Sequence, residues 1–436
     1  MKAAFYTLGC KVNQYETQAM AEALEHRGYE IVDSAQAADA YIVNSCTVTA
    51  ESDRKTRQAV RRLKRNRPDA LVILCGCMPQ AFPEAAQALE QADIILGNRE
   101  KTRLPDIIEQ YYNHNGRLIS ISPQEEREIN DSAQDGAGPC DTITGFRERT
   151  RAIVKIEDGC ERCCAYCVIP YARGPVRSKP LDALRAECTG LAQAGFREIV
   201  LVGINLSAYG TDNHASLCDA AEIAAAFPEI QRVRLGSLEP DLLPEALLDR
   251  LAGIPKLCPQ FHISLQSGCD STLKRMNRHY SAADYRDLCV YIRQSFPDAA
   301  LTTDIMAGFP GETPAEFEAS LAFMQEIGFE KVHVFPYSKR AGTRAAELPD
   351  QVEKKEKERR CRILAEAAQE IRERWLRAQV GRTLSILPET FHADGTAFGY
   401  TANYTPVRIC GDLPGEGIVD VTIAAVDGDC CVGKAV

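Results

Sequence analysis

Four cysteines stand within eight positions of the segment "EDGCERCCAYCVIPYARG", residues 157–174. One interpretation uses all four in two Cys-x-x-Cys pairs, which would give a structural zinc ion its four thiolate ligands. The other uses only Cys160, Cys164 and Cys167, which would hold a 4Fe–4S cluster and leave one iron free to bind another molecule. The zinc interpretation is weakened because Cys163 and Cys164 are adjacent and their side chains diverge. Both interpretations stay open at this point.

Three further cysteines each follow a predicted strand in the first 110 residues: Cys10, Cys46 and Cys77. Short apolar segments alternate there with helical stretches around residues 16–27 and 52–66, and this alternation predicts a doubly wound parallel sheet. The predicted strands are residues 2–8, 29–32, 40–45, 70–76 and 94–97. In such sheets the site lies beyond the carboxyl ends of the strands, so the three cysteines are expected to form one ligand set.

A second α/β series follows from residue 147 to about residue 345, and its six βα units predict an open or partial (β/α)6 barrel. The predicted strands are residues 151–156, 197–203, 232–237, 261–266, 300–308 and 331–338. Polar or small residues stand at or near the ends of these strands, where a barrel has its active face. They include Gly203, Asn205, Ser237, Glu239, Gln266 and Asp304.

The rest of the chain is a charged helix followed by a segment that alternates in period two between turns. That alternation predicts a small β-barrel. We therefore divide the fold, which is of the multidomain α/β class, into five parts. They are an N-terminal domain (1–115), a linker (116–145), a central domain (146–350), a connecting helix (351–379) and a C-terminal barrel (380–436).

Composition restricts the function classes. The chain has 436 residues, 45% of them apolar, and a formal net charge of −10, which argues against simple non-specific binding of nucleic acid. The N-terminus lacks the pattern of a signal peptide and no window has eighteen uninterrupted apolar residues, so we expect a cytoplasmic protein without a membrane span. In that compartment eighteen cysteines do not indicate a disulfide framework, and the clustered ones indicate metal binding.

The spacing Cys160-x-x-x-Cys164-x-Tyr166-Cys167 resembles the signature loop of radical S-adenosylmethionine (SAM) enzymes. The resemblance implies a 4Fe–4S cluster on the three cysteines, with Cys163 a bystander and Tyr166 beside the cluster. In that superfamily the free iron binds SAM, and an electron from the cluster cleaves SAM to methionine and a 5′-deoxyadenosyl radical. The resemblance also implies which residues contact SAM: Gly203, Asn205, Ser237, Glu239, Gln266 and Asp304.

The motifs "SLEP", "HISLQSG", "TTDIMAGFPGET" and "FPYSKRAGT", together with the two cysteine sets, resemble the methylthiotransferase family across essentially the whole chain. This implies that Cys10, Cys46 and Cys77 hold a second 4Fe–4S cluster, whose free iron carries sulfur, and that a second SAM supplies the methyl group. It also implies a flavodoxin-like or ferredoxin-like electron donor. We expect the chain to be a monomer.

Within the family, "LGCKVNQYET" and "YARGPVRSKP" most resemble members that add a methylthio group to C2 of threonylcarbamoyladenosine at position 37 of transfer RNA (tRNA). The C-terminal barrel resembles the RNA-binding TRAM domain, yet from residue 377 onward four basic residues face seven acidic ones, which is unfavourable for binding phosphates. A basic run between residues 54 and 67 contains no acidic residue, and we hypothesise that it shares the RNA contact. Its candidate RNA-binding residues are Arg57, Arg61, Arg62, Lys64 and Arg65.

Several alternatives stay open. The substrate could be an isopentenyladenosine of tRNA or a ribosomal-protein aspartate, and the chain could carry only one cluster. A zinc-stabilised RNA-binding protein without catalysis is the alternative from another class. Iron content separates the two-cluster, one-cluster and zinc hypotheses, because two clusters require about eight irons, one cluster about four, and the zinc protein none.

Overall fold

The computed structural model describes residues 1–114, 116–123, 142–146, 150–411 and 417–436. Most of the predicted linker, including its polar segment "NDSAQDGAGPCDT" up to residue 141, lies outside the described residues. Two of the acidic residues counted in the predicted C-terminal barrel, Asp412 and Glu416, lie outside them as well.

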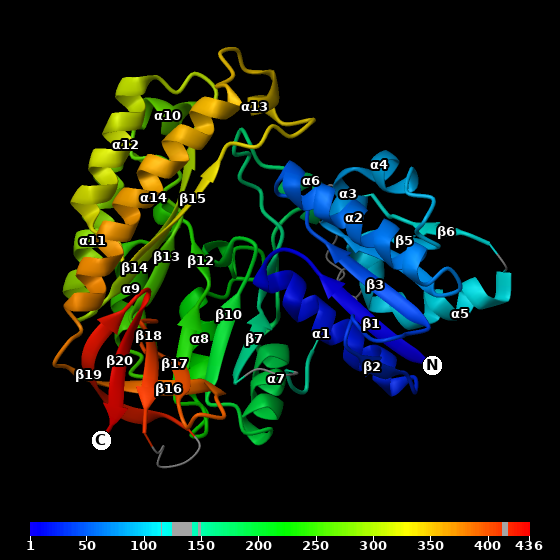
Figure 1. The fold of residues 1–436 in the computed structure, drawn as a ribbon, viewed down its shortest axis with the longest axis horizontal. Helices are drawn as coiled ribbons and strands as arrows, with labels where there is room; N and C mark the ends of the chain where they lie inside the picture. Colours follow the sequence, from blue (N-terminus) through cyan, green and yellow to red (C-terminus); the bar gives the residue numbers. More distant parts are fainter. Residues whose placement is uncertain (115, 124–141, 147–149, 412–416) are drawn as a thin grey trace.

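The N-terminal domain is built on a six-stranded parallel sheet with the order β2-β1-β3-β4-β5-β6 (Figure 1, blue to cyan). The interior strands β3 and β4 are buried along their whole length, because apolar clusters pack on both faces of the sheet. The strands are β1 (Lys2–Thr7), β2 (Glu30–Val32), β3 (Ala40–Ser45), β4 (Leu71–Gly76), β5 (Ile94–Leu96) and β6 (Leu118–Ser120). The predicted doubly wound parallel sheet is confirmed.

The helices of this domain cover the sheet and begin where its strands end. The longest, α2, is capped by Thr49, whose side chain accepts a hydrogen bond from the Ser52 amide. The helices are α1 (Lys11–His26), α2 (Ala50–Asn66), α3 (Cys77–Ala81), α4 (Pro83–Gln87), the 3₁₀ helix η1 (Arg99–Arg103) and α5 (Leu104–His114). Strand β6 falls within the predicted linker; three half-exposed residues at a sheet edge give no apolar run from which to predict a strand.

The central domain consists of two parallel sheets, with the orders β11-β10-β7 and β12-β13-β14-β15, that follow one another around an open barrel. This confirms the predicted partial barrel. The strands are β7 (Arg151–Lys155), β10 (Glu198–Val202), β11 (Arg232–Leu235), β12 (Ser237–Leu238), β13 (Gln260–Ile263), β14 (Ala300–Ala307) and β15 (Lys331–Pro336), with a separate pair β8 (Glu157–Asp158) and β9 (Arg177–Ser178).

Helices surround this barrel, and several begin with a side-chain cap that their sequence supplies. In α12 the hydroxyl of Thr313 accepts a bond from the Glu316 amide and the Glu316 carboxylate accepts one from the Thr313 amide, a capping box. The helices are α6 (Ile169–Arg173), α7 (Leu181–Gln193), η2 (Leu206–Ala208), α8 (Leu217–Ala225), η3 (Pro240–Leu242), α9 (Glu245–Ala252), α10 (Asp270–Arg275), α11 (Ala282–Ser295), α12 (Pro314–Ile327) and α13 (Arg344–Glu347).

The charged helix α14 (Lys354–Arg377) packs on β15 and leads into a closed five-stranded barrel (Figure 1, orange to red). The barrel strands are β16 (Thr383–Phe391), β17 (Ala397–Thr401), β18 (Pro406–Cys410), β19 (Val419–Asp427) and β20 (Cys430–Ala435). This confirms the small C-terminal β-barrel. It docks beside the amino ends of the central strands, where Arg232 donates to the Ser385 carbonyl at 2.7 Å and Arg234 donates to the Ala402 carbonyl at 2.9 Å.

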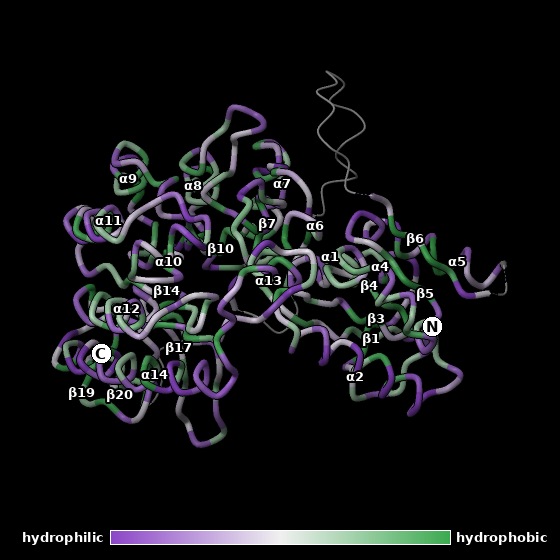
Figure 2. Tube along the Cα trace, turned by 90° about the horizontal axis from the view of Figure 1, so that it is seen from above, coloured by the Kyte–Doolittle hydropathy of each residue, from purple (hydrophilic) through white to green (hydrophobic). Residues whose placement is uncertain are grey.

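The two α/β domains meet along α1 and α6, which lie between them in both views (Figures 1 and 2). Tyr15 of α1 is buried in the apolar core of the central domain and donates a hydrogen bond to Glu187 at 2.8 Å. The hydropathy colouring places the apolar strands inside and the polar residues on the outer helices and loops (Figure 2). None of the described helices has the length and apolar character of a membrane span.

Candidate functional site

Cys10, Cys46 and Cys77 lie at the carboxyl edge of the N-terminal sheet, as the strand-end rule predicts. Each stands just beyond a strand: Cys10 precedes α1, Cys46 follows β3, and Cys77 opens α3 after β4. The close approach of this loop to Cys46 requires glycine at position 9. The φ of Gly9 is +101°, and an added Cβ there would stand 2.6 Å from the Cβ of Cys46. The structure therefore brings these three sequence-distant thiols to one edge.

These thiols lie close to one another and to charged groups. Cys46 and Cys77 are buried, and Cys10 is exposed. Burial raises the pKa of Cys46 to about 11, and the neighbouring Cys77 and Cys10 raise it further. Desolvation by the residues packed around it raises the pKa of Cys10 as well, while the nearby Arg173 opposes that rise and Cys77 reinforces it. Thiolates this close repel one another, so a shared cationic group would stabilise them, and this donor set fits an iron–sulfur cluster.

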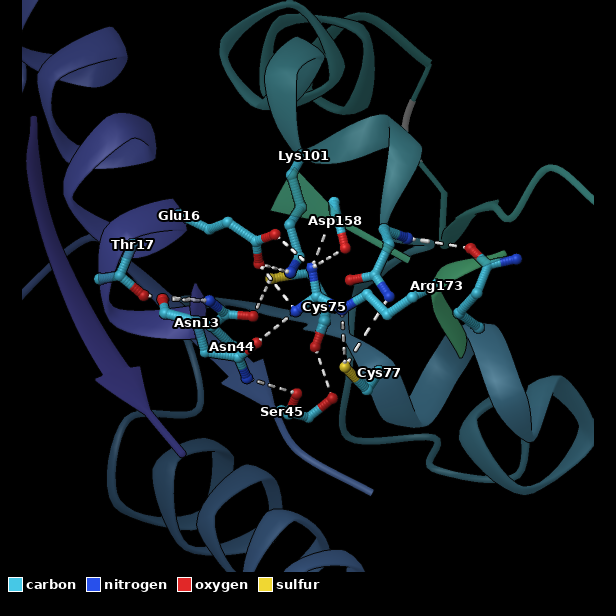
Figure 3. Close-up of polar contacts among 12 residues, drawn as sticks. Asn13, Glu16, Thr17, Asn44, Ser45, Cys75, Cys77, Lys101, Asp158 and Arg173 are labelled. Carbon is cyan, nitrogen blue, oxygen red and sulfur yellow. Dashed lines mark hydrogen bonds and ion pairs between the residues drawn. The ribbon is translucent and has the colours of Figure 1, made fainter. Parts of the chain in front are cut away.

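Arg173 reaches this edge from the central domain, and Figure 3 shows it surrounded by the groups it contacts. Its side chain is completely buried, and its Nε donates to the sulfur of Cys77 at 3.3 Å. Its Nη2 donates to Asn13 at 2.6 Å, and its Nη1 donates to Glu16 and, at 3.3 Å, to both oxygens of Asp158. One guanidinium thus connects a candidate cluster ligand to carboxylates of both domains.

Glu16 is buried as well and is held by cations from three segments. Burial alone would raise the pKa of Glu16, but Arg173, Lys101 and Lys155 hold it well below its usual range. The Lys101 ammonium lies 2.6 Å from Glu16 (Figure 3). The Lys155 ammonium lies 3.2 Å from the same carboxylate. The carboxylate is therefore charged, and the interface between the domains is an ion network rather than an apolar contact alone.

The loop after β8 brings together three of its four cysteines. The Asn205 amide donates to the sulfur of Cys160 at 3.8 Å, and the Ile169 amide donates to that of Cys167 at 3.4 Å. Arg278 donates to the sulfur of Cys164 at 3.3 Å. Burial raises the pKa of Cys160 to about 11 and that of Cys167 to about 12, and in both cases the other thiols of the loop add to the effect.

Cys163 is different from its neighbours. It is exposed, and its thiol donates to the carbonyl of Glu161, two residues away in the same loop, at 3.7 Å. Adjacent Cys163 and Cys164 therefore differ in surroundings, because the Cys164 sulfur accepts from a buried arginine. Across the described residues, no three His, Cys, Asp or Glu side chains form a group that could hold a single metal ion.

Several of the residues predicted to contact SAM lie around these three thiols. Gly203 faces the carboxylate of Glu157, since an added Cβ there would stand 2.4 Å from its Oε2, and the Asn205 backbone amide donates to the same oxygen at 2.7 Å. Burial raises the pKa of Glu157 to about 8. Glu239 accepts from Arg278, the same guanidinium that donates to Cys164.

The remaining residues predicted to contact SAM do not lie together. Ser237 and Asp304, like Gly203, line a cavity of about 1230 Å³ inside the barrel. Tyr166 packs edge-on against Phe309 at 6.4 Å between ring centroids. Gln266 has a left-handed backbone, with φ of +66°, at the carboxyl end of β13.

Buried acceptor atoms without a hydrogen-bond partner near the cysteine loop test whether SAM fits there. Asn205 Oδ1 and Gln266 Oε1 are buried and have no hydrogen-bond partner in the described part of the chain. Buried polar atoms are normally satisfied, so these two indicate a missing donor. SAM carries an ammonium group, an adenine amine and ribose hydroxyls, all of which donate, so these residues fit it.

Helix α6 connects the two cysteine sites. It begins two residues after Cys167 and ends at Arg173, and it packs against α3, whose first residue is Cys77. Asn98 strengthens this contact: its amide donates to the Ala172 carbonyl at 2.6 Å and lies 3.9 Å from the Cys77 sulfur. A single helical turn thus fixes one thiol set relative to the other.

The basic run forms most of α2, and the structure changes its interpretation. The helix starts near Cys46 and then runs back along the sheet, so its basic residues lie progressively farther from the cysteine edge. Lys64 is engaged within the domain, with its ammonium 2.8 Å from Asp93 and 3.0 Å from the Ala70 carbonyl. Arg61 and Arg65 are exposed on the outer face of this helix.

Sequence reasoning missed the residues that hold the thiols. Arg278 and Asn98 carried no signal, because each is an isolated polar residue in the sequence and acquires its partner only through the fold. The structure also places Arg173, from the segment "YARGPVRSKP", on Cys77. The only signal for it was its position six residues after Cys167.

Two family models match the chain. One described as an uncharacterized protein family, UPF0004, matches residues 2–97, and the radical SAM superfamily matches residues 154–324. Among solved structures, the cobalamin- and 4Fe–4S-bound radical SAM methyltransferase TsrM from Kitasatospora setae is similar with a TM-score of 0.55 and 15% sequence identity. The similarity covers 79% of this chain and 77% of that one, and it supports the fold.

The similar curated proteins are tRNA-modifying enzymes. The threonylcarbamoyladenosine tRNA methylthiotransferase MtaB of Thermotoga maritima is 36% identical over 94% of this chain and 92% of its own. The protein of the same name from Bacillus subtilis is 35% identical over 96% of this chain and 93% of its own. A tRNA-2-methylthio-N(6)-dimethylallyladenosine synthase from Pelotomaculum thermopropionicum is 32% identical over 92% of this chain and 90% of its own.

Proposed function

Because the chain belongs to the radical SAM tRNA methylthiotransferase family, and is an enzyme that transfers methylthio groups, we propose that it modifies threonylcarbamoyladenosine at position 37 of tRNA. The methylthio group would be added at C2, with two SAM molecules consumed. The two 4Fe–4S clusters would be held by Cys160, Cys164 and Cys167 and by Cys10, Cys46 and Cys77. A flavodoxin-like or ferredoxin-like donor would supply electrons to a monomeric, cytoplasmic enzyme.

The observation that carries this proposal is the presence of two converging sets of three thiols, joined by α6. When bound, the clusters would supply the reducing electron for SAM cleavage and the iron that carries sulfur. The chain's own residues would orient these groups: Asn205 and Arg278 donate to one thiol set, and Arg173 donates to the other. The higher identity to enzymes named for threonylcarbamoyladenosine supports the choice of nucleoside.

Nucleoside analysis of tRNA tests the substrate. In the organism that carries the gene, its deletion is expected to remove the 2-methylthio form of threonylcarbamoyladenosine and to leave the unmethylthiolated nucleoside in its place. Complementation with the wild-type gene should restore the product, and complementation with Cys160→Ala should not. Loss of the 2-methylthio form of dimethylallyladenosine instead would contradict the proposal and identify the second substrate class.

Helix α2 gives a separate prediction about RNA contact. We expect the double variant Arg61→Glu, Arg65→Glu to bind tRNA more weakly and to flatten the salt dependence of affinity, by about one unit of slope per lost phosphate contact. Lys64 is left intact, because its ion pair with Asp93 supports the domain. Binding isotherms at several salt concentrations measure the effect, and an unchanged slope would show that this face does not contact RNA.

A further inference from the structure

The cavity inside the barrel reaches from one cysteine site to the C-terminal barrel. Cys10 and Lys11 line one end of it, and Tyr400 and Tyr404 line another part. Its volume of about 1230 Å³ is sufficient for a nucleoside with its substituent, since ligand pockets commonly measure about 300–1,000 Å³. The inner faces of β11 to β15 supply its walls, and their side chains therefore decide which substituent it accepts.

Strand register places a row of polar side chains on this wall. Thr302 of β14 pairs with His262 of β13 on one side and with Lys331 of β15 on the other, and Asp304 pairs with His333. All five line the cavity. The row contains two imidazoles, one lysine and one carboxylate, and Arg234 and Gln260 line the same cavity.

Within this row, His262 is held by hydrogen-bond partners, whereas His333 is available to a ligand. His262 uses both ring nitrogens, with Nδ1 3.0 Å from the Thr302 hydroxyl and Nε2 3.5 Å from Asp304. Its ring centroid lies 5.9 Å from that of His333. His333 itself makes no hydrogen bond to a described residue. The carboxylate of Asp304 is thus engaged by His262 and is not the partner of His333.

Lys331 is an exposed cation on this wall. It makes no ion pair with a carboxylate among the described residues, and the adjacent Glu330 is already engaged by Arg372. Desolvation by the neighbouring residues lowers the pKa of His333 most, and His262, Lys331 and Lys11 lower it further, while Asp304 opposes them. Positive charge from two separate domains therefore converges on one imidazole at the wall of the cavity.

Lys331 and His333 are both exposed on this wall, so a ligand in the cavity can reach them, and an anionic group would form charge-assisted hydrogen bonds with them. The threonylcarbamoyl substituent ends in a carboxylate, whereas the dimethylallyl substituent is a hydrocarbon. We infer that Lys331 and His333 bind the carboxylate of the threonylcarbamoyl group, with Lys11 adding charge, and so select this nucleoside over the dimethylallyl one. This inference rests on the proposed function and assigns its specificity to β15.

Binding to anticodon stem-loops tests the inference without turnover. The reconstituted full-length enzyme, without SAM, is titrated with three RNAs that carry threonylcarbamoyladenosine, dimethylallyladenosine or unmodified adenosine at position 37. The wild type should prefer the threonylcarbamoyl RNA over the unmodified one. Lys331→Met should lose about tenfold or more in affinity for the threonylcarbamoyl RNA and bind the unmodified RNA as before. His333→Gln should reduce the same preference, which provides a second variant of similar size.

Lys2→Met is the matched control, because Lys2 is an exposed lysine at the opposite end of the N-terminal sheet, paired with Glu30. It should keep the wild-type preference. Equal weakening of all three RNAs by Lys331→Met would place Lys331 on the phosphate backbone and overturn the inference. A wild type without preference would overturn it too, as would variants that both retain the preference. If nucleoside analysis supports the proposed function but the variants retain the preference, only the carboxylate assignment is wrong.

Discussion

Replacing Arg173 by methionine is expected to weaken the contact between the two α/β domains and to lower the free energy of unfolding substantially. The guanidinium is completely buried and donates to Cys77, Asn13, Glu16 and Asp158. Removing one partner of a buried ion pair leaves uncompensated charge and costs roughly 3–5 kcal/mol. Here two carboxylates and a thiol lose their donor together, so we expect an effect at the upper end of that range.

The matched control is Arg177→Met. Arg177 also pairs with Asp158, at 3.4 Å, but it is 34% exposed and lies outside the Cys77 contact. We expect it to change the unfolding midpoint little, because partly exposed ion pairs contribute only about 0–1 kcal/mol. Thermal unfolding of the apoprotein and limited proteolysis between the domains measure both variants. Equal effects of the two would contradict the assigned importance of Arg173.

The reconstituted Arg173 variant carries a second, independent expectation. A hydrogen bond to a cluster thiolate favours the reduced, more negative cluster, so its loss should shift the reduction potential of the N-terminal cluster to a more negative value. The potential can be followed in a background of Cys160→Ala, which removes the signal of the other cluster. Arg173→Lys keeps the charge but not the planar set of donors, so it should recover stability only in part.

The fold was predictable from the sequence because its signals are local. The strand segments before Cys10, Cys46 and Cys77 are short apolar runs. Because parallel strands end at the same edge of a sheet, their carboxyl ends lie together for any loop conformation. The same logic placed Gly203 and Asn205 near the cysteine loop. Strand β6 escaped prediction because three half-exposed residues at an edge carry no periodicity.

The groups that hold the thiols were not predictable, because they depend on contacts between distant segments. Arg173 meets Cys77 across 96 positions of the sequence, and Arg278 meets Cys164 across 114. A lone arginine in a sequence carries no indication of burial, and most arginines are exposed. The placement of Lys331 and His333 on the cavity wall likewise follows from strand register, which a single sequence leaves undetermined.

Iron content after anaerobic reconstitution should fall by half in Cys160→Ala and stay unchanged in Cys163→Ala. We expect the wild type to hold about eight irons, and Cys160→Ala about four, because each 4Fe–4S cluster needs its own three thiols. Cys46→Ala should also hold about four, through loss of the other cluster. The two cysteine sites use separate side chains, so neither loss should remove both clusters.

Cys163→Ala is the matched control within the same loop, since the Cys163 thiol is exposed and donates only to the Glu161 carbonyl among the described residues. A zinc site built on all four cysteines would instead lose its metal in this variant, because structural zinc needs four protein ligands. Iron, zinc and sulfide analysis of the three variants and the wild type separates these cases. Zinc in the wild type, or loss of all iron in Cys160→Ala, would contradict two independent clusters.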